Sequence, residues 1–179
     1  GVSWSYPSAI SNLTLAPDIL LEANLIKVKC TSAVCMAIGS TGAIPLLAIS
    51  TNKGVTWSYS SEFTRPQGSL TDFSTSTLFS LDCTNKTCVI AGMSNANNNT
   101  PLLAVTRDAG ATWTKPTISN IDLKNRVLNI GKVHYYDGIW FAFGISYSSG
   151  ETVTSNGLIL RSADNGVTWR ANLFQEIST

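Results

Sequence analysis

The stretch that decides the fold is Ser162–Trp169, which reads S-A-D-N-G-V-T-W. Two other stretches repeat it in full, and the first four residues of the chain, G-V-S-W, repeat its last half. The tryptophans that end these strings are spaced by 53, 56 and 56 residues, and a fixed period of this size indicates a repeat architecture. The two other full copies are T-R-D-A-G-A-T-W at Thr106–Trp113 and S-T-N-K-G-V-T-W at Ser50–Trp57.

The residue types of this string predict a tight turn that leads into a strand. An Asp or Asn side chain accepts hydrogen bonds from backbone N–H groups just ahead of it, and the glycine two residues later adopts positive φ without steric cost. The β-branched threonine favours a strand, and the large tryptophan anchors that strand against a neighbouring sheet. The three sets of turn positions are Ser50, Asn52, Gly54 and Trp57; Thr106, Asp108, Gly110 and Trp113; and Ser162, Asp164, Gly166 and Trp169.

This pattern, S/T-x-D-x-G-x-T-W, resembles the Asp box of sialidase-type β-propellers, also called the bacterial neuraminidase repeat. Two of the full copies match it throughout, whereas Asn52 replaces the acid in the first. The resemblance implies an all-β fold of four-stranded antiparallel blades, with the box in the turn between the third and fourth strands. It also implies that the box residues are structural and remote from the active face.

The repeat predicts three complete blades at residues 25–75, 76–125 and 126–179, after an orphan N-terminal strand and a linker at residues 1–24. A propeller typically needs 4–8 blades to close. We therefore expect either part of a longer protein, trimmed inside a motif, or a homodimer that completes a ring. The expected strands are 25–30, 35–38, 45–49 and 55–59; 78–83, 88–91, 101–105 and 111–115; and 126–135, 139–145, 157–161 and 167–173.

The composition narrows the class of protein. The chain of 179 residues is 44% hydrophobic and 13% charged, which excludes an extended disordered chain. Its net charge of +1, with Lys and Arg scattered singly, argues against a nucleic-acid partner. No apolar run approaches the roughly 20 residues of a membrane helix.

The four cysteines form two pairs with the same spacing, Cys30 with Cys35 and Cys83 with Cys88. Zinc is the alternative to disulfides, but finger-type zinc pairs usually have two intervening residues. In the third copy Tyr135 and Trp140 stand at the cysteine positions. Positions that accept either a disulfide or an aromatic pair are expected to face each other across a hairpin. The sequence therefore predicts two disulfides, no metal and an extracytoplasmic location, secreted, periplasmic or at the cell surface.

Candidate catalytic residues are few. The sialidase resemblance implies three arginines that grip a carboxylate, a Tyr–Glu nucleophile pair and an acidic general acid, and no glutamate here stands in such a context. Xyloglucan-cleaving propellers carry the same box and use two aspartates, for which Asp82 and Asp137 are the candidates outside the boxes. We expect both to be solvated turn residues instead. His134, the only histidine, is expected to be an outward-facing strand residue, so no catalytic residue and no cofactor is predicted.

Binding residues are easier to suggest. Tyr136, at a predicted turn, and Tyr147, in a long polar loop, are candidates for stacking on sugar rings. Three Asn-x-Thr strings, at residues 12–14, 85–87 and 98–100, fit the N-glycosylation acceptor. We expect a non-catalytic exported recognition or scaffold module that binds a protein or a carbohydrate through its loops, as the related sortilin-type receptors and photosystem assembly factors bind proteins. The alternative is a fragment of a sialidase-like or xyloglucanase-like glycoside hydrolase.

Overall fold

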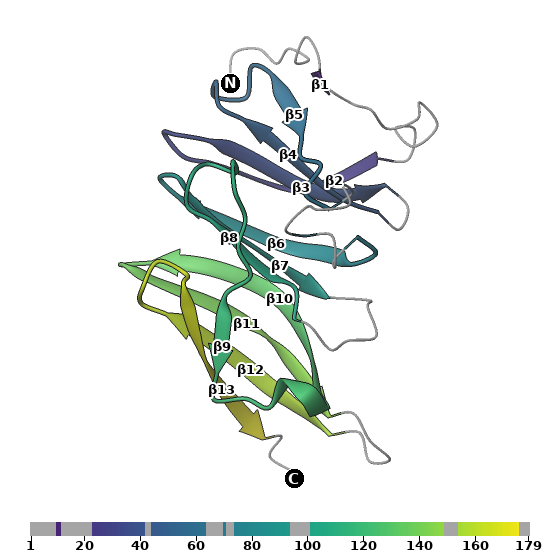
Figure 1. The fold of residues 1–179 in the computed structure, drawn as a ribbon, viewed down its shortest axis with the longest axis vertical. Coiled ribbons are helices and arrows are strands. Elements are labelled where there is room, and N and C mark those ends of the chain that lie inside the picture. The colour runs from purple at the N-terminus through teal and green to yellow at the C-terminus, as the bar shows by residue number, and fades with distance from the viewer. Residues whose placement is uncertain are drawn as a thin grey trace.

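The protein is all-β in its computed structural model, which describes residues 10–11, 23–41, 44–63, 70, 74–93, 101–148 and 154–175. Figure 1 shows small twisted groups of strands stacked along the long axis, with β2–β5 at the top, β6–β8 in the middle and β10–β13 at the bottom. In the described part of the chain no helix is long and apolar enough to cross a membrane. The strands are β1 (Ile10–Ser11), β2 (Ala23–Cys30), β3 (Cys35–Thr41), β4 (Ile44–Ser50), β5 (Trp57–Tyr59), β6 (Thr77–Thr84), β7 (Thr87–Met93), β8 (Leu103–Thr106), β9 (Thr117–Ser119), β10 (Arg126–Tyr136), β11 (Ile139–Ser148), β12 (Ser155–Ser162) and β13 (Thr168–Gln175), with a 3-10 helix, η2 (Leu123–Asn125), before β10.

The strands form three units of antiparallel hairpins that follow the sequence repeat. Unit 1 is β2–β5, unit 2 is β6–β8 and unit 3 is β10–β13. In unit 2 the expected fourth strand at 111–115 is reduced to a single bridge between Val105 and Thr114. Units 2 and 3 are also joined into one sheet by a single pair, Asn129 with Met93.

Two short parallel strands add to the expected antiparallel pattern. β1 pairs in parallel with β5, and β9 pairs in parallel with β13. Each follows a tryptophan of the repeat along the chain and lies on the outer edge of the next unit. The structure corrects the ends of the predicted orphan strand and of the linker predicted at 11–24: Ile10 and Ser11 form β1 in the sheet of unit 1, and Ala23 and Asn24 begin β2. Residues 1–9 and 12–22 lie outside the described residues.

A β-bulge recurs at the same place in every unit. The pairing of the first two strands shifts register between Leu25 and Lys27, and the same shift occurs in units 2 and 3. A glycine stands opposite each bulge, at Gly39 in unit 1, because a Cβ there would lie 1.8 Å from the backbone oxygen of Asn24. The equivalent Cβ positions at Gly92 and Gly144 would lie 2.0 Å from backbone oxygens. The bulge increases the local twist of each sheet.

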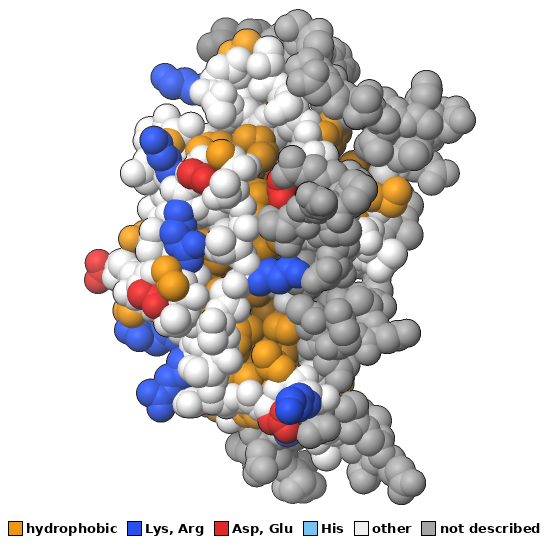
Figure 2. Space-filling model, viewed as in Figure 1, with side chains coloured by type: hydrophobic (Ala, Val, Ile, Leu, Met, Phe, Trp, Pro, Cys, Tyr) orange, Lys and Arg blue, Asp and Glu red, His pale blue; other side chains and the backbone are white. Residues whose placement is uncertain are grey.

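The core lies between the units. One apolar cluster joins units 1 and 2 and includes Met36, Leu81 and Trp113, and a second joins units 2 and 3 and includes Val105 and Trp169. In each strand alternate side chains point to opposite faces, so unit 2 packs one face on unit 1 and the other on unit 3. Figure 2 shows apolar side chains between the stacked sheets, with charged side chains scattered singly over the visible face.

Candidate functional site

The repeated string forms the same hydrogen-bonded turn in all three units. In unit 3 the Ser162 hydroxyl donates to the Asp164 carboxylate at 2.7 Å and accepts from the N–H of Gly166 at 3.0 Å. Asp164 also accepts from the N–H and the hydroxyl of Thr168, at 3.0 and 2.6 Å. Unit 2 repeats all of these contacts. Unit 1 repeats the hydroxyl, glycine N–H and threonine N–H contacts, with the amide oxygen of Asn52 as the acceptor in place of the carboxylate. These residues are therefore engaged with one another and form a structural turn.

The glycine of each turn lies in the left-handed region, with φ of 85° at Gly54, 92° at Gly110 and 78° at Gly166. The residue before each glycine also has positive φ, which the sequence pattern did not predict; Ala109, for example, has φ of 61°. Two successive left-handed residues turn the chain sharply enough for the threonine N–H to reach the acid. The carbonyl of Gly166 then accepts from the indole N–H of Trp169 at 3.1 Å.

The acids of these turns are held ionised. The pKa of Asp164 is lowered to about 2, first by the hydroxyl of Thr168 and then by its backbone N–H. At Asp108 burial raises the pKa, but hydrogen bonds from Thr112 and Thr106 outweigh it and the net shift is downward. Asn52 replaces the charge in unit 1 and donates its amide to the Thr56 hydroxyl at 2.7 Å. The turn therefore tolerates an amide when the threonine hydroxyl becomes the acceptor.

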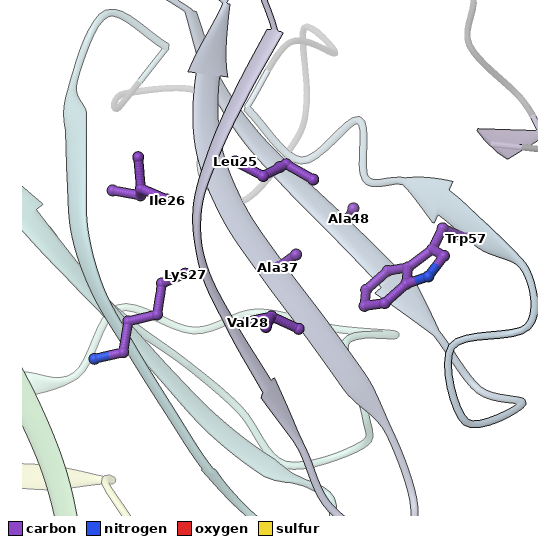
Figure 3. A pocket seen from close by; sticks show the side chains of 7 residues that line it. All are labelled: Leu25, Ile26, Lys27, Val28, Ala37, Ala48 and Trp57. Carbon is purple, nitrogen blue, oxygen red and sulfur yellow. The ribbon is translucent and has the colours of Figure 1, made fainter. Parts of the chain in front are cut away.

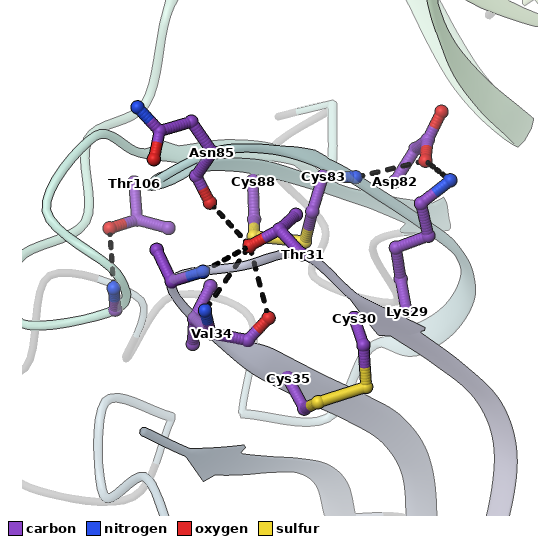
Figure 4. Close-up of a disulfide and its surroundings, with 12 residues drawn as sticks. Lys29, Cys30, Thr31, Val34, Cys35, Asp82, Cys83, Asn85, Cys88 and Thr106 are labelled. Atoms are coloured by element: carbon purple, nitrogen blue, oxygen red, sulfur yellow. Dashed lines mark hydrogen bonds and ion pairs between the residues drawn. A yellow bond between two sulfur atoms is a disulfide. The ribbon is translucent and has the colours of Figure 1, made fainter. Parts of the chain in front are cut away.

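The cysteine pairs are disulfides at equivalent positions. Cys30 and Cys35 are directly paired on β2 and β3 with a Cα–Cα distance of 4.0 Å, and Cys83 and Cys88 are paired on β6 and β7 at 4.1 Å. In unit 3 the pair is Tyr135 with Trp140, whose ring centroids are 5.0 Å apart. Figure 4 shows the two disulfides on neighbouring hairpins, with the hydroxyl of Thr31 bound to the carbonyl of Asn85 at 2.7 Å.

A buried carboxylate links the first strands of the three units. Asp82 accepts the N–H of Cys83 at 2.9 Å and that of Tyr135 at 2.8 Å, and its oxygens lie 2.8 Å from Lys29 Nζ and 3.3 Å from His134 Nδ1. The side chain of Asp82 is only 7% exposed. The prediction of a solvated turn residue is therefore wrong, because Asp82 lies within β6 and its partners come from β2 and β10, which sequence spacing does not bring together.

These contacts determine what Asp82 can do chemically. Burial raises its pKa, but the hydrogen bonds from Lys29, Tyr135 and Cys83 outweigh burial, so that the net shift is downward. A general acid near neutral pH needs a raised pKa, so Asp82 is poorly suited to donate a proton. A general base needs a free lone pair directed at substrate, and both oxygens of Asp82 are already engaged.

Around Asp82 the first strands present a polar, mostly cationic row, which we call the first-strand row. It comprises Lys27 and Lys29 of β2, Ser80 and Asp82 of β6, and Lys132, His134 and Tyr136 of β10. Lys27 donates to the Ser80 hydroxyl at 3.3 Å, and Ser80 in turn accepts the N–H of Val133. Four of these side chains are cationic or become so on protonation, against one carboxylate, so the row favours a negatively charged ligand.

The predicted binding tyrosines differ in exposure. Tyr136, the last residue of β10, is 69% exposed, and it lies two residues from His134 on the same face of the strand. Tyr147 is half-buried within β11, opposite Val127 and Ser155, and so belongs to a strand instead of a loop. Asp137 follows Tyr136 in an exposed turn with φ of 44° and is not a contact of Asp82.

Of the four described arginines, Arg107 and Arg126 are held by structural partners. Arg107 donates to the carbonyl of Asn165 in the next turn, and Arg126 donates to side chains of its own sheet. Arg170 lies directly across the ladder of β12 and β13 from Arg161. Because these partners lie in different elements, the contacts build no three-arginine grip within the described ranges. Those ranges also contain no group of three His, Cys, Asp or Glu side chains able to hold a metal ion.

An apolar pocket of about 390 Å³ lies at the opposite end of the stack from unit 3. Figure 3 shows Leu25, Val28, Ala37, Ala48 and Trp57 on one side of the sheet of unit 1, with Ile26 and Lys27 on the other side of β2. The first five have repeat equivalents in unit 2 that are all buried in the core with unit 1: Leu78, Leu81, Ile90, Ala104 and Trp113. The pocket is thus the surface on which a preceding unit would pack, which makes it a poor candidate for a small-molecule site.

Comparison with known proteins gives fold-level likeness only. No protein-family model and no curated protein matches the sequence. Similar solved structures include a protein of unknown function from Dyadobacter fermentans (15% identity, 86% of this chain and 50% of that chain, TM-score 0.48). They also include a sucrose-6-phosphate hydrolase from Lactobacillus gasseri (14% identity, 87% of this chain and 35% of that chain, TM-score 0.44). A third is a bifunctional GH43-CE protein from Bacteroides eggerthii (11% identity, 90% of this chain and 22% of that chain, TM-score 0.42). The chain spans half or less of the length of these proteins.

Proposed function

We propose that this chain is an exported, non-catalytic recognition module, and that it binds an acidic carbohydrate along the first-strand row. Residues 25–75, 76–125 and 126–179 would be three blades of an Asp-box β-propeller. The observation that carries the proposal is the state of Asp82: the buried carboxylate that the sequence offered as a catalytic acid is occupied by three residues of neighbouring strands and by its own neighbour Cys83.

The ligand class follows from what the row leaves available. Lys132 is exposed, the side chain of His134 is 55% exposed, and Tyr136 beside them is 69% exposed. Ammonium groups bind carboxylate or sulfate groups, and an exposed aromatic face offers a stacking surface for a sugar ring. The two disulfides support an oxidising, extracytoplasmic compartment, where such polysaccharides are found.

The test is binding of acidic and neutral polysaccharides, measured by affinity electrophoresis and calorimetry. We expect the acidic polymer to bind, the neutral one to bind weakly, and binding to weaken as salt rises. Tyr136→Ala and Lys132→Gln should each weaken binding by about tenfold, whereas Val55→Ala and Lys53→Gln, exposed in the turn of unit 1, should leave it unchanged. Equal weakening of binding by the two row variants and the two turn variants would refute the site.

A hydrolysis assay on the same polysaccharides separates this proposal from the glycoside-hydrolase alternative. Release of reducing ends by the purified chain, abolished by Asp82→Asn, would contradict a non-catalytic module. Binding without product, with Asp82→Asn affecting only stability, is the result that the occupied carboxylate supports.

A further inference from the structure

The stack of three units ends in two apolar faces, one on unit 1 and one on unit 3. On unit 1, Leu25 is 45% and Val28 59% exposed beside the 390 Å³ pocket. On unit 3, Phe143 is 39% and Phe174 54% exposed. Such faces are buried between units elsewhere in the stack, since apolar side chains at the equivalent positions form the two core clusters.

The exposed face of unit 1 corresponds to the face by which units 2 and 3 pack on the preceding unit. The exposed face of unit 3 corresponds to the face by which units 1 and 2 pack on the following unit. The face of unit 1 that packs on unit 2 includes Met36, Ile38 and Leu47, all fully buried. Their repeat equivalents in unit 2 are Val89, Ala91 and Leu103, which are buried against unit 3. In unit 3 the equivalents are Phe141, Phe143 and Ile159, and in the described part of the chain no further unit packs on them.

Size complementarity points to the same pairing. The pocket of unit 1 has Ala37 and Ala48 at its floor, which leave it hollow. Unit 3 has bulky rings at the facing positions, since Phe141 and Phe143 lie stacked with centroids 6.2 Å apart. A projecting pair of rings thus stands at one end of the chain's stack and a depression at the other.

The turn glycines show the same vacancy. A Cβ at Gly110 would lie 2.6 Å from Ile49, and a Cβ at Gly166 would lie 3.1 Å from Val105, because each turn rests on the preceding unit. Among the described residues, the equivalent Gly54 has only Trp57 of its own turn within 4 Å. In the described part of the chain no neighbouring sheet therefore lies against the turn of unit 1, at the place where the other two turns have one.

We propose that a second copy of this chain docks its unit 3 on unit 1 of the first, head to tail, so that Phe141 and Phe143 fill the pocket beside Val28 and Trp57. The joint repeats the existing contact between units. Two such joints, related by a two-fold axis, close a six-unit ring.

Charge gives this joint a recognisable signature. At the joints within the chain, first-strand residues at equivalent positions meet: Lys29 lies against Asp82, and Asp82 against His134. At the proposed joint the equivalent contact brings Lys132 and His134 of one copy toward Lys27 and Lys29 of the other. Like charges repel in dilute salt and are screened in concentrated salt, so association strengthens as salt rises.

The experiment is sedimentation velocity of the full chain over a concentration series, at low and high salt. Val28→Asp and Phe143→Asp should each weaken self-association by at least ~100-fold, because each buries a carboxylate in an apolar contact. Val28 is 59% exposed, so Val28→Asp should retain the circular dichroism and the melting temperature of the parent chain. Phe143 is 39% exposed and stacks on Phe141, so Phe143→Asp should retain the circular dichroism with a lowered melting temperature. Val167→Asp, 50% exposed in the turn of unit 3, is the matched control and should associate as the parent chain does.

Mixing the two variants distinguishes the head-to-tail joint from other arrangements. Val28→Asp retains an intact unit 3 face and Phe143→Asp an intact unit 1 face, so a 1:1 mixture has one intact joint of the two in the ring. It should associate more strongly than either variant alone and more weakly than the parent chain. A parent chain that stays monomeric at all concentrations overturns the proposal, as does a mixture that associates no more strongly than either variant alone while the parent chain associates.

Discussion

Substituting Gly166 by alanine should cost stability through two separable effects. The first is backbone strain, since Gly166 has φ of 78°, which costs a non-glycine residue about 1–2 kcal/mol. The second is crowding, since the new Cβ would lie 3.1 and 3.3 Å from the methyl carbons of Val105 in the preceding unit. Forcing an extra methyl into a packed contact typically costs about 1–3 kcal/mol. We therefore expect Gly166→Ala to lower the free energy of unfolding by about 2–5 kcal/mol.

Gly54→Ala is the matched control, because Gly54 has φ of 85° and only Trp57 near the new Cβ, at 3.8 Å. It should show the strain alone, about 1–2 kcal/mol. A double-mutant cycle isolates the crowding: in a Val105→Ala background the methyl carbons are gone, so Gly166→Ala should cost about 1–2 kcal/mol less than it does in the parent chain. The assay is urea unfolding followed by tryptophan fluorescence, with the disulfides intact. Equal costs at Gly54 and Gly166, together with no coupling to Val105, would refute the packing of the turn on the preceding unit.

Three further predictions follow from single contacts. Gly144→Ala should lower the free energy of unfolding in urea by about 3 kcal/mol or more, because its Cβ would lie 2.0 Å from the Asn129 carbonyl oxygen. Gly131→Ala is the control and should be near neutral, because no described atom lies within 4 Å of its Cβ position. Similar costs for the two variants would contradict the close approach of the strands at the bulge. Asp82→Asn should cost about 1–3 kcal/mol by leaving buried N–H groups poorly paired, and an unchanged melting temperature would contradict its role between units. The lowered pKa of Asp164 contributes stability that is complete above the unfolded-state pKa near 4 and is lost as pH falls toward about 2. Asp164→Asn should therefore be less stable than the parent chain at pH 6 and approach it at pH 2. A difference in melting temperature that stays constant from pH 6 to pH 2 would refute this linkage.

The sequence predicted the features that recur in it. The repeat placed most of the strands to within two residues, and the interchange of cysteines with Tyr135 and Trp140 predicted their direct cross-strand pairing. These predictions depend on local spacing and alternation, which a single chain displays directly. The glycines opposite the bulges recur in the sequence at equivalent positions of the repeats. Why glycine is needed there depends on the neighbouring strand, whose backbone oxygen would lie 1.8–2.0 Å from a Cβ, and a single strand does not show this.

The candidate site was less accessible to sequence reasoning. Asp82 reads as a polar residue beside a turn, and its burial depends on Lys29 and Tyr135, each 53 residues away. Lys29 and His134 stand at the positions equivalent to Asp82 in the neighbouring copies, and this equivalence was the available signal: equivalent residues on first strands lie side by side when the units stack. Tyr147 was misplaced for a related reason, since β11 runs on to Ser148, beyond the expected end of the strand at residue 145.

The stacking of each turn on the preceding unit can be measured directly by nuclear Overhauser effects in a methyl-labelled sample. The account predicts cross-peaks from the Gly110 α-protons to the δ-methyl of Ile49, and from the Gly166 α-protons to the γ-methyls of Val105. The two glycines are 56 residues apart in the sequence, and so are Ile49 and Val105, so the two contacts are repeats of one another. If these resonances are assigned and neither cross-peak is seen, the units do not stack in this way and the account is contradicted.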